Sequence, residues 1–273
     1  MNTAETILRV PGREVRRFAP YHPWERNFFL SWVLLISLCI LAGFWREIIQ
    51  QIETHQSAPP LIVLFHAAAF VGWLALLTAQ VLLIRSRRVN LHRRLGVAGM
   101  GLAGAMVILG TAAALSMGRL QFDASGRVTP LLSAQIADMV AFAGLAGAAF
   151  LLRKQPAAHK RLILLATVSI SDAGFARLLG WDGAPFPWLF ELFRAGGGGG
   201  LERFWPDMGA FCLGPAIMIL GLGVYDWITR RRLHPVYVAG TAFLAALFTL
   251  KVALMVDPLW KIWKPAAIRL IGL

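Results

Sequence analysis

Five ionisable side chains stand inside otherwise apolar stretches of the sequence, where they could do chemistry. They are His66, Asp138, Asp172, Arg177 and Lys251. A charged side chain at the centre of a membrane-spanning helix costs about 2.5–3.5 kcal/mol on insertion scales, so such residues are candidates for a functional site. Because unpaired charges are costly to bury, we expect Asp138 or Asp172 to pair with Lys251 or Arg177. A histidine near a carboxylate would permit proton exchange near neutral pH.

Another acidic residue, Asp226, lies close to the end of its apolar stretch, with Arg230 one helical turn further on. Oppositely charged residues four positions apart are neighbours on a helix surface. We therefore expect Asp226 and Arg230 to form a helix-end pair rather than a working site.

A polar stripe accompanies these charges. His66, Trp73 and Gln80 are spaced by seven residues, so they share one helix face. That face is expected to point into a bundle, as a hydrogen-bonded packing seam or as one wall of a cavity. The stripe and the intramembrane charges together define the predicted polar pocket: His66, Trp73, Gln80, Asp138, Asp172, Arg177 and Lys251.

Two similar motifs precede apolar stretches. H-R-R-L begins at His92 and H-K-R-L at His159, 67 residues later. This offset relates the stretches on either side of the two motifs and predicts an internal repeat of two helical hairpins. Histidine and arginine at such positions can anchor helices to lipid phosphates. In the alternative interpretation, the repeat brings His92 and His159 together as axial ligands of haem b.

Seven apolar stretches would position these residues. The chain has 273 residues, of which 58% are hydrophobic and 15% charged, and its mean hydropathy is +0.63. Soluble domains carry roughly 25% charged residues, whereas a spanning helix needs about 20 mostly apolar ones. The sequence predicts an all-α, polytopic transmembrane helical bundle of about seven spans, in which spans two and three repeat as spans four and five. The spans are expected at 28–45, 61–84, 95–117, 131–152, 162–179, 208–228 and 236–256.

Basic residues are concentrated in every second connection. The segment 1–27 and the connections 85–94, 153–161 and 229–235 hold 17 of the 27 lysines and arginines. By the positive-inside rule, these segments and the N-terminus face the cytoplasm and the C-terminus lies outside, in a bacterial inner membrane. The basic face would contact anionic lipid. Because the arginine clusters are short loops at the interface, the net charge of +13 does not indicate nucleic-acid binding.

This topology divides the chain into a basic cytoplasmic segment (1–27), a seven-helix transmembrane domain (28–256) and an interfacial tail (257–273). In the tail, Trp260 and Trp263 alternate with lysines in the manner of an interfacial anchor. Four pocket residues, His66, Asp138, Asp172 and Lys251, lie five to seven residues from the outer ends of their spans, which predicts a similar depth in the outer half of the membrane.

The runs H-A-A-A-F-V-G-W, H-R-R-L-G and A-A-H-K-R-L lie between His66 and Leu178. In this region the chain resembles an uncharacterised family of bacterial multi-pass membrane proteins, a likeness that implies a fold and no particular activity. The H-R-R-L-G run is also similar, more weakly, to helix starts in transmembrane b-type cytochromes. That likeness implies haem held between two histidines on separate spans, although only His66 lies well inside a span.

Three hypotheses of function follow. In the first, the polar pocket binds a small molecule or a proton. In the second, haem b between His92 and His159 exchanges electrons with a quinone. In the third, the protein is a structural or accessory membrane subunit whose buried charges fix the packing. The sequence contains no P-loop, dinucleotide fingerprint, G-x-S-x-G or C-x-x-C motif that would indicate soluble catalysis.

Overall fold

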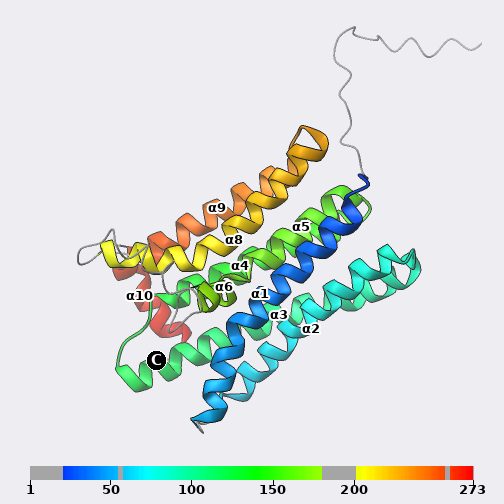
Figure 1. Cartoon of the computed structure of the whole chain (residues 1–273). Coiled ribbons are helices and arrows are strands. Elements are labelled where there is room, and N and C mark those ends of the chain that lie inside the picture. Colours follow the sequence, from blue (N-terminus) through cyan, green and yellow to red (C-terminus); the bar gives the residue numbers. More distant parts are fainter. Residues whose placement is uncertain (1–20, 55–57, 180–200, 256–258, 273) are drawn as a thin grey trace, which may run out of the picture.

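The computed structural model describes residues 21–54, 58–179, 201–255 and 259–272, and the elements in these ranges are helices (Figure 1). They are α1 (Glu25–Glu53), α2 (Leu61–Arg85), α3 (Val89–Ser125), α4 (Leu131–Leu151), α5 (Pro156–Ser169), α6 (Asp172–Leu179), α8 (Leu201–Arg230), α9 (Pro235–Met255) and α10 (Leu259–Leu270). Six of them, α1, α2, α3, α4, α8 and α9, are long and apolar enough to cross a membrane. Helices α5 and α6 form a further candidate span that bends by 53°. The expected all-α bundle is confirmed.

Much of the bundle surface is apolar. Leu61, Val97, Ile108 and Leu151 are all at least 70% exposed, and they lie on three different helices. Soluble monomers rarely expose large contiguous apolar surfaces, whereas lipid tails are their natural surroundings. The long apolar helices and their exposed side chains are those of a multi-pass membrane protein.

The basic connections gather at one end of the bundle. Helix α1 begins there, and the α2–α3, α4–α5 and α8–α9 turns lie at the same end (Figure 1). We call this the basic end, and we call the end that carries α10 the opposite end. Arg87 and Arg231, in two of these turns, have φ angles of 61° and 53°. This left-handed conformation allows the chain to reverse within a few residues.

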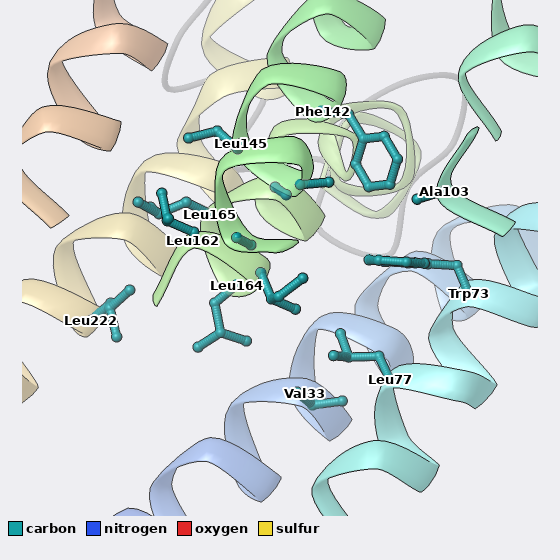
Figure 2. Close-up of a cluster of buried hydrophobic side chains, with 14 of the residues drawn as sticks. Val33, Trp73, Leu77, Ala103, Phe142, Leu145, Leu162, Leu164, Leu165 and Leu222 are labelled. Atoms are coloured by element: carbon teal, nitrogen blue, oxygen red, sulfur yellow. The ribbon is translucent and has the colours of Figure 1, made fainter. Parts of the chain in front are cut away.

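Helix α5 lies at the centre of the bundle. Residues 161–168 are all buried, because α5 packs against α4, α8 and α9. The two hairpins expected from the repeat are both present, since α2 packs along α3 and α4 along α5. Figure 2 shows how the core side chains of five neighbouring helices converge on α5: Val33, Trp73, Ala103, Phe142, Leu145 and Leu222 surround Leu162, Leu164 and Leu165.

The fifth expected span, 162–179, is not one helix. It breaks between Ser169 and Asp172, where serine side chains bond to the backbone. Ser169 Oγ donates to the carbonyl of Ala166 at 2.8 Å, and Ser171 Oγ donates to the carbonyl of Val168 at 2.7 Å. Such local bonds offer the backbone an alternative to the helix ladder. The sequence S-I-S-D therefore ends α5 and starts α6, inside the apolar part of the chain.

Helix α3 is longer than the expected span 95–117. Its 37 residues extend about 55 Å, well beyond a hydrocarbon core of about 30 Å. The extra turns at the opposite end carry α10, with Arg119 Nη1 donating to the carbonyl of Gly272 at 3.0 Å. Trp260 and Trp263, expected at the membrane interface, are partly buried in a cluster with residues of α3 and α4. The tail is thus packed onto the bundle over residues 259–272.

Two glycines allow α1 and α6 to cross closely. A Cβ atom at Gly43 would collide with the carbonyl oxygen of Gly174, and one at Gly174 would lie 2.9 Å from the Cα atom of Ile40. Since both obstacles are backbone atoms, no side-chain rotation could relieve them. By contrast, a Cβ atom at Gly104 on α3 would meet nothing within 4 Å.

We predict that Gly174→Ala lowers the free energy of unfolding by about 1–3 kcal/mol, the usual range for overpacking a close contact. Gly104→Ala is the matched control and should be neutral or slightly stabilising, because alanine is the better helix former. Unfolding of both variants in detergent, followed by circular dichroism, measures the difference. Equal stability of the two variants would contradict the close crossing of α1 and α6.

Candidate functional site

Three of the predicted pocket residues meet as one ionic cluster. The Nζ atom of Lys251 lies 2.9 Å from Asp138 Oδ1 and 3.3 Å from Asp172 Oδ2. The three side chains are only 10–17% exposed. We call these residues the triad. The expected pairing of opposite charges is confirmed, with Lys251 bridging both carboxylates.

Each member of the triad comes from a different helix. Asp138 lies in the second turn of α4, about 10 Å from its start, and Lys251 lies in the last turns of α9. Asp172 is the first residue of α6, and its Oδ1 accepts a hydrogen bond from the backbone N–H of Ala173 at 2.7 Å. The break between α5 and α6 thus fixes where the second carboxylate stands.

The triad has an unbalanced charge. With both carboxylates ionised, one ammonium group faces two negative charges, so the cluster carries a formal charge of −1. Cys212 on α8 is close enough to interact electrostatically with all three residues. A site of this kind can hold one further positive charge, such as a proton. The sequence offered no sign of the cysteine's proximity, because Cys212 lies in an ordinary apolar run.

The polar stripe on α2 points into the bundle, as expected, and Trp73 contacts another helix. Trp73 Nε1 donates to Thr167 Oγ1 on α5 at 3.1 Å. His66 packs against the ring of Phe70, with centroids 4.2 Å apart, and its Nδ1 atom is buried without a hydrogen-bond partner among the described residues. The Oε1 atom of Gln80 is buried in the same way. Trp73 therefore fits the expected hydrogen-bonded packing seam, whereas the buried polar atoms of His66 and Gln80 do not. None of the described contacts of the stripe is with the triad.

Arg177 reaches a different partner from the one expected. Its Nε atom is paired with Glu47 of α1, and its guanidinium group lies 4.4 Å from the centroid of the Phe44 ring. It also donates to the backbone carbonyl of Ala173 at 3.2 Å. Arg177 thus ties α6 to α1, while Lys251 is the residue that pairs with the triad's carboxylates.

A second ionic cluster lies at the basic end. Arg161 on α5 and Asp226 on α8 form a two-pronged pair, with Nε and Oδ2 2.8 Å apart, and both side chains have no exposed surface. Arg230 lies 3.8 Å from Asp226, so the expected helix-end pair is present but is the weaker of the two contacts. Glu25 of α1 binds both Arg230 and Lys160. This network joins α1, α5 and α8.

His234, in the α8–α9 turn, lies next to this network. Burial, together with the nearby Arg161 charge, lowers the pKa of His234 to about 4. The imidazole is therefore neutral at neutral pH, and the positive charge at this buried position comes from arginine and lysine alone. His234 thus adds no further cation to a turn that already holds Arg231 and Arg232.

The two motif histidines lie within electrostatic range of each other. His92 interacts electrostatically with His159 and with the backbone of Gln80. The Nδ1 atom of His159 lies 2.8 Å from the carbonyl oxygen of Ala149, a contact that orients the ring. Among the described residues there is no group of three or more histidine, cysteine, aspartate or glutamate side chains that could hold a metal ion. The pair offers two imidazole ligands and no more.

Comparison of the chain with protein-family models, curated proteins and solved structures finds no match. What the sites can do is therefore argued from their geometry.

The buried Arg161–Asp226 pair leads to a prediction. Arg161→Met leaves Asp226 charged and poorly paired in the core, which should cost about 3–5 kcal/mol of stability. The double variant Arg161→Met, Asp226→Leu removes both charges and should regain most of this loss. Thermal unfolding of the purified variants in detergent tests the difference. If the double variant is as unstable as the single one, the attraction between Arg161 and Asp226 itself stabilises the bundle. The cost of leaving Asp226 unpaired would then not explain the loss.

Proposed function

We propose that this chain is a multi-pass protein of the bacterial inner membrane that binds and releases a proton at the triad. In this proposal the basic end faces the cytoplasm and the C-terminus lies outside, so the triad occupies the outer half of the membrane. We also propose membership of the uncharacterised family whose H-R-R-L-G and H-K-R-L motifs the chain resembles. The observation that carries the proposal is Lys251 bridging two buried carboxylates at a break in a spanning helix.

The chemistry follows from charge and burial. A cluster with one ammonium and two carboxylate groups becomes neutral when it binds one proton, and a low-dielectric surrounding favours the neutral form. Because Lys251 contacts both carboxylates, a small movement of its ammonium group is enough to strengthen one of the two contacts and weaken the other. Proton binding at the triad would therefore change how strongly α9 is held to α4 and to α6.

The helix break supplies an element that can move. Broken helices in membrane proteins lie where the backbone lines a binding site, and their halves can shift against each other. Here α6 carries Asp172 and the Arg177–Glu47 contact with α1, while α5 is fixed in the core. Protonation of the triad would loosen α6 without disturbing α5. This coupling is what a proton-driven transport step for a small molecule requires.

We predict that Asp138→Asn and Asp172→Asn each remove a pH-dependent carboxyl signal in difference infrared spectra of the purified protein. The signal is the C=O stretch of a protonated carboxylic acid, which appears as one triad carboxyl binds its proton. Asp123→Asn is the matched control, because Asp123 is an exposed residue paired with Arg119 on α3. If the control loses the same signal, or if neither triad variant does, the triad does not bind the proton. A parallel measurement of proton flux in proteoliposomes shows whether binding is coupled to movement across the membrane.

One observation favours a second candidate function. The contact between His159 and the Ala149 carbonyl resembles the way in which haem- and metal-binding histidines are oriented by their second nitrogen, and His92 is the neighbouring imidazole. Haem b held by His92 and His159 would transfer electrons, with a quinone as the partner. We expect a purified sample, expressed with a supply of haem, to show a Soret band that is lost in His92→Ala and in His159→Ala. A wild-type sample without that band contradicts haem binding and leaves the triad proposal untouched.

A further inference from the structure

A hollow at the basic end is lined by arginines on an apolar floor. It is shallow and open to the surface, and it lies between the first turn of α1, the last turns of α2 and the first turns of α3, with a volume of about 610 Å³. Arg26, Arg85 and Arg88 supply three guanidinium groups, and Leu82 and Leu95 form much of the floor. Leu82 is 46% exposed, so the floor continues onto the apolar surface of α2.

Two of these arginines hold each other in place through neutral oxygen atoms. Arg85 Nη1 donates to the backbone carbonyl of Arg26 at 3.0 Å and to Asn27 Oδ1 at 2.8 Å. Arg26 Nη2 donates to the backbone carbonyl of Arg85 at 3.2 Å. Each guanidinium group has five N–H donors, so these contacts orient the groups and leave most of their donors for a ligand.

The charge at this hollow is not neutralised by the described part of the chain. Within those residues, Arg161, Arg177 and Arg230 pair with carboxylates, whereas Arg26, Arg85 and Arg88 form no ion pair. Three cations around one hollow repel each other unless an anion lies between them. The geometry therefore calls for an anionic occupant that also has apolar parts to cover the leucine floor.

From this arrangement we infer that the hollow binds the phosphate group of an anionic glycerophospholipid, with an acyl chain lying along Leu82 and Leu95. Guanidinium groups bind phosphate oxygens in pairs, and basic hollows between the ends of spanning helices hold the headgroups of anionic lipids. The site lies where the apolar surface of α2 ends, which is the depth of the headgroup layer for a helix that spans the membrane. The inference does not depend on the triad.

A second, smaller hollow supports the same occupant. It has a volume of about 330 Å³ and is lined by Arg87, Arg88, Val89, Asn90 and Leu91 on the α2–α3 turn. Arg88 lines both hollows. Arg87 has a left-handed φ of 61°, a conformation that is unfavourable for arginine and would suit glycine better. The turn thus holds the consecutive cations Arg87 and Arg88 beside two hollows that share Arg88.

The test measures lipid binding to the full-length protein purified in detergent. Phosphatidylglycerol is titrated in, and bound lipid is counted by native mass spectrometry while thermal stability is followed in parallel. We expect saturable binding of phosphatidylglycerol, with a raised melting temperature, and neither effect with phosphatidylcholine. Inorganic phosphate at the same concentration should not raise the melting temperature, because it leaves the apolar floor uncovered.

Two variants and a control locate the site. Arg26→Gln and Arg88→Gln should each weaken phosphatidylglycerol binding about fivefold, the effect of removing one cation from a membrane-surface site. Arg94→Gln is the matched control, because Arg94 is an exposed arginine on α3 that does not line the hollow. Equal weakening by Arg94→Gln would overturn the inference in favour of diffuse attraction. Stabilisation by phosphate alone would overturn it in favour of a free-anion site, and equal binding of phosphatidylcholine would remove the role of the headgroup charge.

Discussion

The need to pair every buried charge is the constraint on which this structure depends. Hydrocarbon offers no water to solvate an ion, so each charged side chain inside the bundle must find its partner on another helix. Lys251 meets Asp138 and Asp172 near the opposite end, and Arg161 meets Asp226 at the basic end. Because each pair joins helices that are distant in sequence, the pairs determine which helices are neighbours. Apolar packing alone specifies the neighbours only weakly, since the surfaces of the helices are as apolar as the lipid tails.

Both ionic clusters lie along the α5–α6 segment and α8. The α5–α6 segment carries Arg161 at one end and Asp172 at the other, and α8 carries Asp226 and, near the triad, Cys212. The break between α5 and α6 separates the two clusters mechanically. The Arg161–Asp226 pair joins α5 to α8, while Asp172 joins α6 to α9 through Lys251. The two halves of the broken span are thus held by different ionic contacts.

The sequence predicted the architecture, and it predicted the pairing of Asp138 and Asp172 with Lys251 as one alternative beside Arg177. It did not predict the buried pair at the basic end. Apolar stretches of about 20 residues predict the spans. Within those spans, Lys251 and the two aspartates lie at similar distances from the outer ends, which favours contact between them. Both arguments need only the positions of residues along the chain. The burial of Arg161 could not be foreseen in this way. It stands in a basic motif at a helix start, where arginine usually faces headgroups, and only the position of α5 at the centre of the bundle brings it beneath α8. The helix break was missed because serine and aspartate interrupt the ladder through local bonds that leave the apolar pattern intact.

Equivalent residues of the two repeated hairpins lie in different surroundings. Arg94 and Arg161 occupy equivalent positions in the two hairpins, yet Arg94 is exposed and Arg161 has no exposed surface. The same offset of 67 residues relates Asp172 to Ala105 and Asp138 to Val71, both uncharged, and the equivalent region of α3 continues as an unbroken helix. One hairpin thus lies at the edge of the bundle and keeps its basic motif at the surface, where its turn lines the arginine hollows. The other lies at the centre, where the same motif must be neutralised by an acidic partner and where a carboxylate pair can be shielded from water. Two copies of one hairpin have in this way become suited to different surroundings, one to the lipid headgroups and the other to buried charge.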